Sequence, residues 1–361
     1  MNSVTDRFEL RLQDYSLSED QDSVRDAFGE FFAKECPSSV VRAAEPLGFD
    51  QALWSKLLGM GVTSMSLPAA QGGDDATLVD LVLITEELGR TVAPVPFISH
   101  VVCTRLLAAA GADTEILQSA VEGQTLVALA FDQVTDAAAR QLVPDAAIAG
   151  DVISFERAPD DGGSPELLVL NRAGQPRPQV ANQGSTPLAW WDAGTAGDRI
   201  VLAEGATARK LHDRAVAEWK LLTAAALVGM TDAALQLAVD FAKTRQTMGV
   251  PIGSLQGVSF PLADIAMGTS GARNLIWRAA WLAEHEPDER PELVAMAFAY
   301  AARIATHGTT TAAHLQGGLG FTSEADASLY FLRAKGWSVL GGDPNLDLIS
   351  VGDSLLANVV S

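Results

Sequence analysis

Apolar residues recur at helical spacing throughout the first third of the chain. Ser18 stands at a typical N-cap position with Gln21 three residues later, and the apolar residues that follow recur every three or four positions. Three further stretches share this period: residues 52–60, residues 77–90 and the segment from Pro96 through Leu107. The pattern predicts an N-terminal helical domain over residues 1–118.

Between Thr125 and Gly205 the pattern changes to short apolar runs, LVALAF, AAIAGDVISF, ELLVLN and RIVLAEG, separated by clusters of Pro, Gly and Asp. Runs of this length bounded by turn residues are typical of strands. We therefore expect a small β domain over residues 119–210. The tracts RAPDDGGSPE and NQGSTPLAWWDAGTAGD are predicted to be connecting loops.

Helical spacing returns from Asp213 onward, and residues 219–243 carry a continuous apolar stripe that ends before Gly249 and Pro251. Two more long helices are expected over residues 262–282 and 292–315. Both have apolar residues on more than one face, as in a bundle that also buries a subunit interface. The predicted fold is mainly α, with a small central β domain and a C-terminal helical bundle over residues 211–361.

Composition narrows the class of protein. The chain has 361 residues, of which 48% are hydrophobic and 19% charged, and it has a net charge of −20. No run approaches the length of about 18 apolar residues that spans a membrane, and the first thirty residues lack the pattern of a secretion signal. The negative charge argues against nucleic-acid or membrane binding, and two distant cysteines suit a reducing cytoplasm.

Arg245 falls in the last turn of a predicted helix, just before the turn residues Gly249, Pro251 and Gly253. A guanidinium on a rigid element suits bidentate contact with a phosphate. The plainer interpretation is that a basic residue near a helix C-terminus complements the helix dipole. The motif alone does not decide between the two.

Gly317, Gly318 and Gly320 follow the last long helix, and Thr322 to Glu324 resemble a new helix start. Glycines allow the backbone to approach a ligand closely, so that N–H groups can point at phosphate oxygens. The alternative is an ordinary turn between two helices. Taken alone, these glycines are also ambiguous.

The combination of the two motifs is more specific than either. KTRQTMGVPIGSLQ at Lys243–Gln256 precedes LQGGLGFTSE at Leu315–Glu324 by about sixty residues. In this order and spacing they resemble the acyl-CoA dehydrogenase family. The N-terminal half adds LPAAQGG at residues 67–73, EELGR at 86–90 and PVPF at 94–97, so the resemblance spans nearly the whole chain and is weakest in the β domain.

The resemblance implies the family's fold, with an N-terminal helical domain, a middle β-barrel and a C-terminal four-helix bundle. It also implies a flavin cofactor, FAD, bound mainly to a neighbouring subunit. In the family, residues of the two motifs hold the pyrophosphate and adenosine side of the flavin. The corresponding residues here are Arg245, Gln256, Gly317, Gly318 and Gly320. Two positions of the same site depart from the family pattern: Met248 stands where a Phe is usual, and His314 where a Gln is typical.

The family reaction needs a carboxylate that removes the α-proton of an acyl-CoA thioester while a hydride leaves the β-carbon for the flavin. The two family positions of this Glu align with Gly341 and Trp219, and neither residue can act as a base. Glu218 and Asp343 lie close to these positions. We interpret both as solvated surface acids, so no catalytic residue is assigned.

By this resemblance the chain is the non-catalytic subunit of a heteromeric acyl-CoA dehydrogenase, of the kind that actinobacterial steroid-degrading systems pair with a catalytic subunit in an α2β2 assembly. The partner would hold most of the acyl-CoA substrate. Two alternatives stay open. One is a self-sufficient homo-oligomeric flavoenzyme that uses Glu218 or Asp343, and the other is a flavin-free scaffold or regulatory protein of the same fold.

Overall fold

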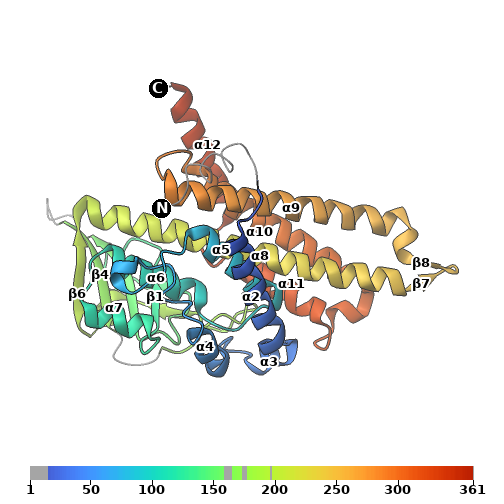
Figure 1. Ribbon diagram of the computed structural model, residues 1–361, viewed down its shortest axis with the longest axis horizontal. Coiled ribbons are helices and arrows are strands. Elements are labelled where there is room, and N and C mark those ends of the chain that lie inside the picture. Colours follow the sequence, from blue (N-terminus) through green and yellow to red (C-terminus); the bar gives the residue numbers. More distant parts are fainter. Residues whose placement is uncertain (1–14, 158–164, 173–176, 196, 361) are drawn as a thin grey trace. The chain divides into compact units, whose positions relative to one another are not determined.

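The computed structural model describes residues 15–157, 165–172, 177–195 and 197–360, and these residues are mainly helical with a small group of strands (Figure 1). The chain divides into two compact units. Unit 1 consists of Met1–Ser39, Thr77–Ala93 and Lys220–Ser361, and unit 2 of Val40–Ala76 and Pro94–Trp219. The three-domain division with boundaries after residues 118 and 210 stays a prediction.

Unit 1 is built mainly from helices. They are α2 (Glu19–Glu35), α5 (Leu78–Thr91), the C-terminal part of α8 (Gly205–Thr244), α9 (Gln256–His285), α10 (Glu292–Leu315), α11 (Asp326–Trp337) and α12 (Pro344–Val360). The capping box predicted at Ser18 is confirmed, since the Ser18 side chain accepts from the backbone N–H of Gln21 and the Gln21 side chain accepts from that of Ser18. Helix α10 has the predicted limits at both ends.

The EELGR segment holds α5 against α8 within unit 1. A Cβ added at Gly89 of α5 would lie 2.1 Å from the backbone oxygen of Ala226 in α8, and one added at Gly229 would lie 1.9 Å from that of Glu86. The two backbones therefore touch, which only glycine allows. Beside this contact the Glu86 carboxylate pairs with Arg273 of α9 at 2.7 Å, so the motif is part of the packing of unit 1.

Unit 2 combines short helices with two sheets. Its helices include α4 (Gln51–Leu58), α6 (Phe97–Ala109) and α7 (Thr114–Val121), while α3 (Ser38–Ala43) begins at the unit boundary. A four-stranded sheet has the order β1 (Val127–Leu129), β3 (Asp151–Arg157), β4 (Glu166–Arg172), β6 (Arg199–Glu204). The β1–β3 pair is parallel and the other two pairs are antiparallel. The predicted β region is thus confirmed.

Two details of unit 2 differ from the predicted pattern. The tract NQGSTPLAWWDAGTAGD contains a strand, β5 (Ala189–Trp191), which pairs antiparallel with β2 (Gln141–Val143). Trp191 is fully buried in the core of the unit, whereas Trp190 is 44% exposed. The aromatic packing of Trp191 explains why a tract with many turn residues forms a strand. Most of the other predicted loop, residues 158–164, lies outside the described residues.

Helix α8 begins at Gly205, earlier than the sequence pattern indicated. The early turns carry mostly polar and charged residues, so the apolar period is weak there although Ala208 and His212 are buried. By length and composition α8 is the one helix in the described part of the chain that could cross a membrane. However, 67% of its most apolar window is buried inside the protein, as in the core helix of a soluble protein.

Candidate functional site

Arg245 immediately follows α8 and begins a tight hairpin of β7 (Gln246–Thr247) and β8 (Val250–Pro251). Its backbone is fixed, because its N–H donates to Phe241 O at 2.8 Å and its carbonyl accepts from Ile252 N at 2.8 Å. The guanidinium is exposed, and within the described residues no carboxylate forms an ion pair with it. A rigid base with a free cationic end suits anion binding.

The hairpin tip presents Met248, which is 97% exposed and has a φ of 49°. The chain then passes through the short 3-10 helix η3 (Ile252–Ser254) to Gln256, the first residue of α9, whose side chain is also exposed. Arg245, Met248 and Gln256 therefore all lie on the surface at the start of α9. Their exposure leaves all three side chains accessible to a ligand.

The glycine motif forms the 3-10 helix η4 (Gly317–Phe321), not the loop and helix start that the sequence suggested, and α11 begins only at Asp326. Gly317 has a φ of 62°, and a Cβ on Gly320 would lie 2.1 Å from the backbone oxygen of Ala313. These two glycines are required by the bend itself. Gly318 differs, because a Cβ there would meet no atom within 4 Å, so its backbone is open to a ligand.

A shared apolar cluster brings the two motifs to one end of unit 1. The cluster contains Ala242 from the end of α8, Val258 from the start of α9, and Ala312 and Leu315 from the end of α10. Arg245 and Gln256 are within three residues of the first two, and His314 and Gly317 are within two residues of Leu315. His314 is exposed on the last turn of α10. Helix packing thus places the predicted site residues in one region, near β7 and β8 in Figure 1.

Large apolar side chains surround this region. The exposed ones are Met248, Val250, Leu255, Phe260, Leu319 and Phe321, with exposed fractions between 40% and 97%. Exposed apolar side chains grouped around a cation mark a surface that another molecule covers. The guanidinium and the open backbone at Gly318 can bind a diphosphate, and the apolar residues can cover the groups attached to it.

The two candidate bases, Glu218 and Asp343, lie in different environments. Glu218 is buried in unit 2 with 6% exposure, so its interpretation as a solvated surface acid is wrong. Its Oε2 accepts from Arg105 Nε at 2.9 Å, and its Oε1 accepts from Arg214 Nε at 2.8 Å. Burial alone would raise the pKa of Glu218, but the charges and hydrogen bonds of both arginines outweigh burial and hold the pKa below its ordinary value. Such a carboxylate is a weak base.

Trp219 stands at the second position where family members place the catalytic Glu. Its side chain is buried next to Glu218 and fills this position. Its ring centroid lies 4.5 Å from that of Phe131, and its Nε1 donates to Ser99 Oγ at 3.3 Å. Aromatic packing and a hydrogen bond therefore fix the indole in place. The position of a base is occupied by a structural side chain.

Asp343 lies on the exposed turn before α12, and the solvated interpretation is confirmed for it. Its Oδ1 accepts from the backbone N–H of Asn345 at 3.0 Å and from the Asn345 side chain at 2.8 Å. The carboxylate thus caps the turn at the start of α12. Gly341, two residues earlier, supplies no side chain to this region.

Sequence reasoning missed two residues near Trp219. Arg105 interrupts the apolar run of α6, and a lone arginine in such a run signals a buried ion pair. The sequence around Asp145 carries no comparable sign that this acid is buried. Burial raises the pKa of Asp145 to about 6, even though a hydrogen bond with Ser99 opposes the shift. Its backbone φ is 61°, in the region that Asn and Asp adopt more readily than most residues.

Comparison with known proteins connects both halves of the chain to one family. The model of the acyl-CoA dehydrogenase N-terminal domain matches residues 18–116, and that of the C-terminal domain matches residues 213–356. Acyl-CoA dehydrogenase IpdE2 of Mycobacterium tuberculosis is 28% identical over 331 residues, covering 90% of this chain and 94% of that protein. Acyl-CoA dehydrogenase FadE27 of the same organism is 29% identical and covers 80% of this chain and 83% of that protein.

Two solved structures have closely similar folds. The ChsE4–ChsE5 complex from Mycobacterium tuberculosis contains a chain that matches with a TM-score of 0.80 at 25% identity, covering 95% of this chain and 99% of that one. Butyryl-CoA dehydrogenase from Megasphaera elsdenii matches with a TM-score of 0.81 at 22% identity, covering 95% and 100%. At that identity the second match supports the fold alone.

Proposed function

Because this chain belongs to the acyl-CoA dehydrogenase family, whose members are FAD-dependent oxidoreductases that act on the CH–CH bond of acyl-CoA thioesters, we propose that it is the subunit of a heteromeric member that lacks the catalytic glutamate. Its role is to contribute FAD contacts across the subunit interface. The proposal depends above all on the state of the candidate bases, and the exposed diphosphate site supports it.

The observation that carries the proposal is the Arg105–Glu218–Arg214 cluster beside Trp219. A general base must reach the proton that it removes and must have a pKa high enough to accept it. Glu218 has both oxygens engaged by guanidinium groups and a lowered pKa. Trp219 and Gly341 carry no carboxylate at all. The proton transfer therefore belongs to a carboxylate of the partner subunit.

The residues assigned to this chain bind the pyrophosphate and adenosine side of the cofactor. FAD, when bound, supplies the acceptor for the hydride that leaves the β-carbon. Arg245 holds the diphosphate through its guanidinium, Gln256 offers an amide donor and acceptor, and the backbone at Gly318 approaches the ligand without a side chain in the way. His314 and Met248 complete the same surface. These residues bind and orient the cofactor without touching the reacting carbon atoms.

The names of two similar structures support a proposal for the partner and the substrate. One of the matching structures is the ChsE4–ChsE5 complex, and another is named the Tcur3481–Tcur3483 steroid acyl-CoA dehydrogenase variant, with a TM-score of 0.83. By this likeness the chain pairs with a catalytic acyl-CoA dehydrogenase subunit in an α2β2 assembly. That subunit holds most of a steroid-derived acyl-CoA substrate. A cytoplasmic location fits both the relatives and the burial of α8.

Co-purification tests the pairing. Expressed together with the product of the adjacent gene, as the candidate catalytic subunit, the chain is expected to form a yellow, active complex with one flavin for every two chains. Expressed alone, it is expected to be colourless or insoluble. A yellow and active homotetramer of this chain alone would instead establish a self-sufficient flavoenzyme.

Two matched substitutions in the complex test the cofactor contact. Arg245→Ala is expected to lower the flavin content and the turnover together. Lys243→Ala is the control, because Lys243 is an exposed cation two residues away that lies 3.6 Å from Asp240, and it should change neither. If Arg245→Ala leaves flavin content and turnover at the wild-type level, the chain serves as a scaffold and does not bind the cofactor.

A further inference from the structure

Large aliphatic side chains lie exposed along α12, the last helix of unit 1. Within residues 344–356 they are 44–67% exposed, and they are Leu346, Leu348, Ile349, Leu355 and Leu356. We call these five residues the α12 face. They form a patch of roughly a few hundred Å², and exposed apolar patches of this size mark surfaces that another molecule covers. The α12 face therefore indicates an interface.

The α12 face is continuous around one side of the helix. Successive residues of an α-helix are rotated by about 100°, so Leu348 and Leu355 lie within about 20° of each other, as do Ile349 and Leu356. These two lines of side chains are about 100° apart, and Gly352 lies midway between them. A Cβ added at Gly352 would meet no atom within 4 Å. The middle of the face is therefore open, and a second helix can approach it closely.

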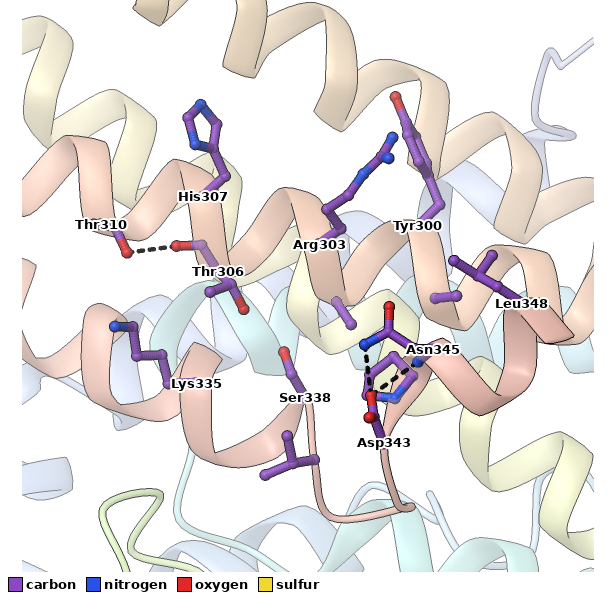
Figure 2. Close-up of a pocket in the computed structure, with 14 residues that line it drawn as sticks. Tyr300, Arg303, Thr306, His307, Thr310, Lys335, Ser338, Asp343, Asn345 and Leu348 are labelled. Carbon is purple, nitrogen blue, oxygen red and sulfur yellow. Dashed lines mark hydrogen bonds between the residues drawn. The ribbon is translucent and has the colours of Figure 1, made fainter.

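Another side of α12 holds the helix on unit 1. At its start, Asn345 donates to Asp343 Oδ1 with its backbone N–H at 3.0 Å and with its side chain at 2.8 Å, as the dashed lines of Figure 2 show. One turn later the buried Asp347 accepts from Lys220 Nζ of α8 at 2.5 Å, and Val351 is buried as well. In Figure 1 the helix then extends beyond α9 and α10. The α12 face is thus the outer surface of a helix that is already anchored.

The α12 face is far from the FAD-contact surface proposed above, although both belong to unit 1. Lys220 of α8 pairs with α12, whereas Arg245 immediately follows the other end of α8. At 1.5 Å per helical residue, these two positions are roughly 37 Å apart along the helix axis. The two surfaces can therefore contact different molecules at the same time.

The lack of charge on the α12 face favours a second copy of this chain as its occupant. Within residues 344–356 no charged residue lies between the two lines of side chains, and the exposed Asp353 lies about 40° outside them. Two copies that each carry a net charge of −20 repel each other wherever their charged surfaces meet. Contacts between identical chains are self-complementary and rich in apolar area, whereas charges supply the specificity for a different partner. An uncharged aliphatic face suits the first kind of contact.

We propose that the α12 face joins two copies of this chain across a two-fold axis that passes near Gly352. The α12 face is the apolar centre of this contact, and the surface around it completes the area of about 800 Å² per copy that a standard interface buries. The inference rests on the proposed function in one respect, because the α2β2 assembly requires a second contact that joins one pair of unlike subunits to the other. The FAD-contact surface faces the catalytic partner, and the remote α12 face makes the second contact.

Ile349→Asp tests the contact in the complex with the catalytic subunit, and Ser350→Asp is the matched control. Both residues are exposed neighbours on α12, but Ser350 lies about 100° away from Ile349 on the polar side. A dilution series followed by light scattering gives the concentration at which the α2β2 complex splits into αβ pairs. Ile349→Asp should raise this concentration by a factor of about ten or more, with the thermal midpoint and the flavin content per pair unchanged. Ser350→Asp should behave as the wild type.

Gly352→Cys identifies the molecule that covers the face. Cys36 and Cys103 are both buried, so the new thiol is the accessible one, and a short bis-maleimide should link two copies of this chain. The chain alone should link in the same way, because the contact uses no partner residue, so this result does not depend on the proposed function. Linkage to the catalytic subunit, no linkage at all, or an α2β2 complex that Ile349→Asp leaves intact would overturn the proposal. Arg245→Ala, which reports on the flavin contact, should keep the α2β2 mass.

Discussion

Glu218 and Arg105 are 113 residues apart in the sequence and form a two-point ion pair, with Nε to Oε2 at 2.9 Å and Nη2 to Oε1 at 3.3 Å. Both side chains are at most 10% exposed. Glu218 lies next to a position where family members place the catalytic base. Here its carboxylate instead holds α6 and α8 together. Four predictions test this pair and other contacts within the chain.

Glu218→Gln is expected to lower the free energy of unfolding by about 3 kcal/mol, because it removes the buried negative charge that Arg105 and Arg214 both contact. Turnover per flavin in the assembled complex should stay at the wild-type value. Urea unfolding and steady-state kinetics measure the two effects. Since the folded pKa of Glu218 is lowered, the pair stabilises the fold above the unfolded pKa of about 4.3, and this stability is lost as the pH falls further.

A paired substitution is the control for this prediction. Arg105→Met with Glu218→Leu removes both charges, and it should recover part of the stability that Glu218→Gln loses. If Glu218→Gln instead abolished turnover at unchanged stability, Glu218 would be a base and the chain a catalytic subunit.

Asp145→Asn is expected to stabilise the protein by up to about 3 kcal/mol at pH 7, because the pKa difference between 3.8 and about 6 corresponds to about 1.4 kcal/mol per pKa unit. Burial raises the pKa of Asp145 to about 6 from 3.8. Between these values the unfolded state releases a proton that the folded state keeps, so wild-type stability falls as the pH rises from 4 to 6. Asn tolerates the φ of 61° at this position.

Thermal unfolding across pH measures the effect of Asp145→Asn. The gain should be full above pH 6 and absent at pH 4. The exposed Asp198→Asn serves as the control, with no pH-dependent gain expected. An equal gain at both pH values would contradict the assignment of Asp145 as the titrating group.

Gly318→Ala and Gly320→Ala separate the two uses of the glycine motif. Gly320→Ala places a methyl group 2.1 Å from the Ala313 carbonyl and is expected to cost about 2 kcal/mol through overpacking. Gly318→Ala meets no atom within 4 Å and should leave the unfolding midpoint unchanged while it lowers the flavin content of the complex. Normal flavin content in Gly318→Ala would remove this backbone from the proposed contact.

Gly89→Ala tests the contact of α5 with α8. The added Cβ would lie 2.1 Å from the Ala226 carbonyl and 2.7 Å from the Ala226 Cα, and neither backbone can yield within a packed bundle. We expect a loss of about 3 kcal/mol by urea unfolding. Gly271→Ala on α9 is the matched control, since its nearest neighbour is the Tyr300 hydroxyl at 3.7 Å. It should gain up to about 1 kcal/mol from helix propensity.

The sequence by itself determined the features of this protein that depend only on residues close together along the chain. The capping box at Ser18 and the limits of α10 follow from spacing over three or four residues, which is a local property of helices. The motifs around Arg245 and Gly317 are contiguous strings, so they identified the family and the candidate cofactor surface. Where the local signal was weak, as in the polar first turns of α8, the predicted helix began too late.

Only the tertiary structure decided which charges are buried and which are free. The sequence gives Glu218 and Asp343 the same chemistry, yet one is enclosed by two arginines and the other caps an exposed turn. It likewise gives Arg105 and Arg303 the same side chain, but one is paired in a core and the other faces an open groove. The reason is that the environment of a charge depends on residues brought close by packing between distant segments, and the local pattern of apolar positions does not encode those neighbours.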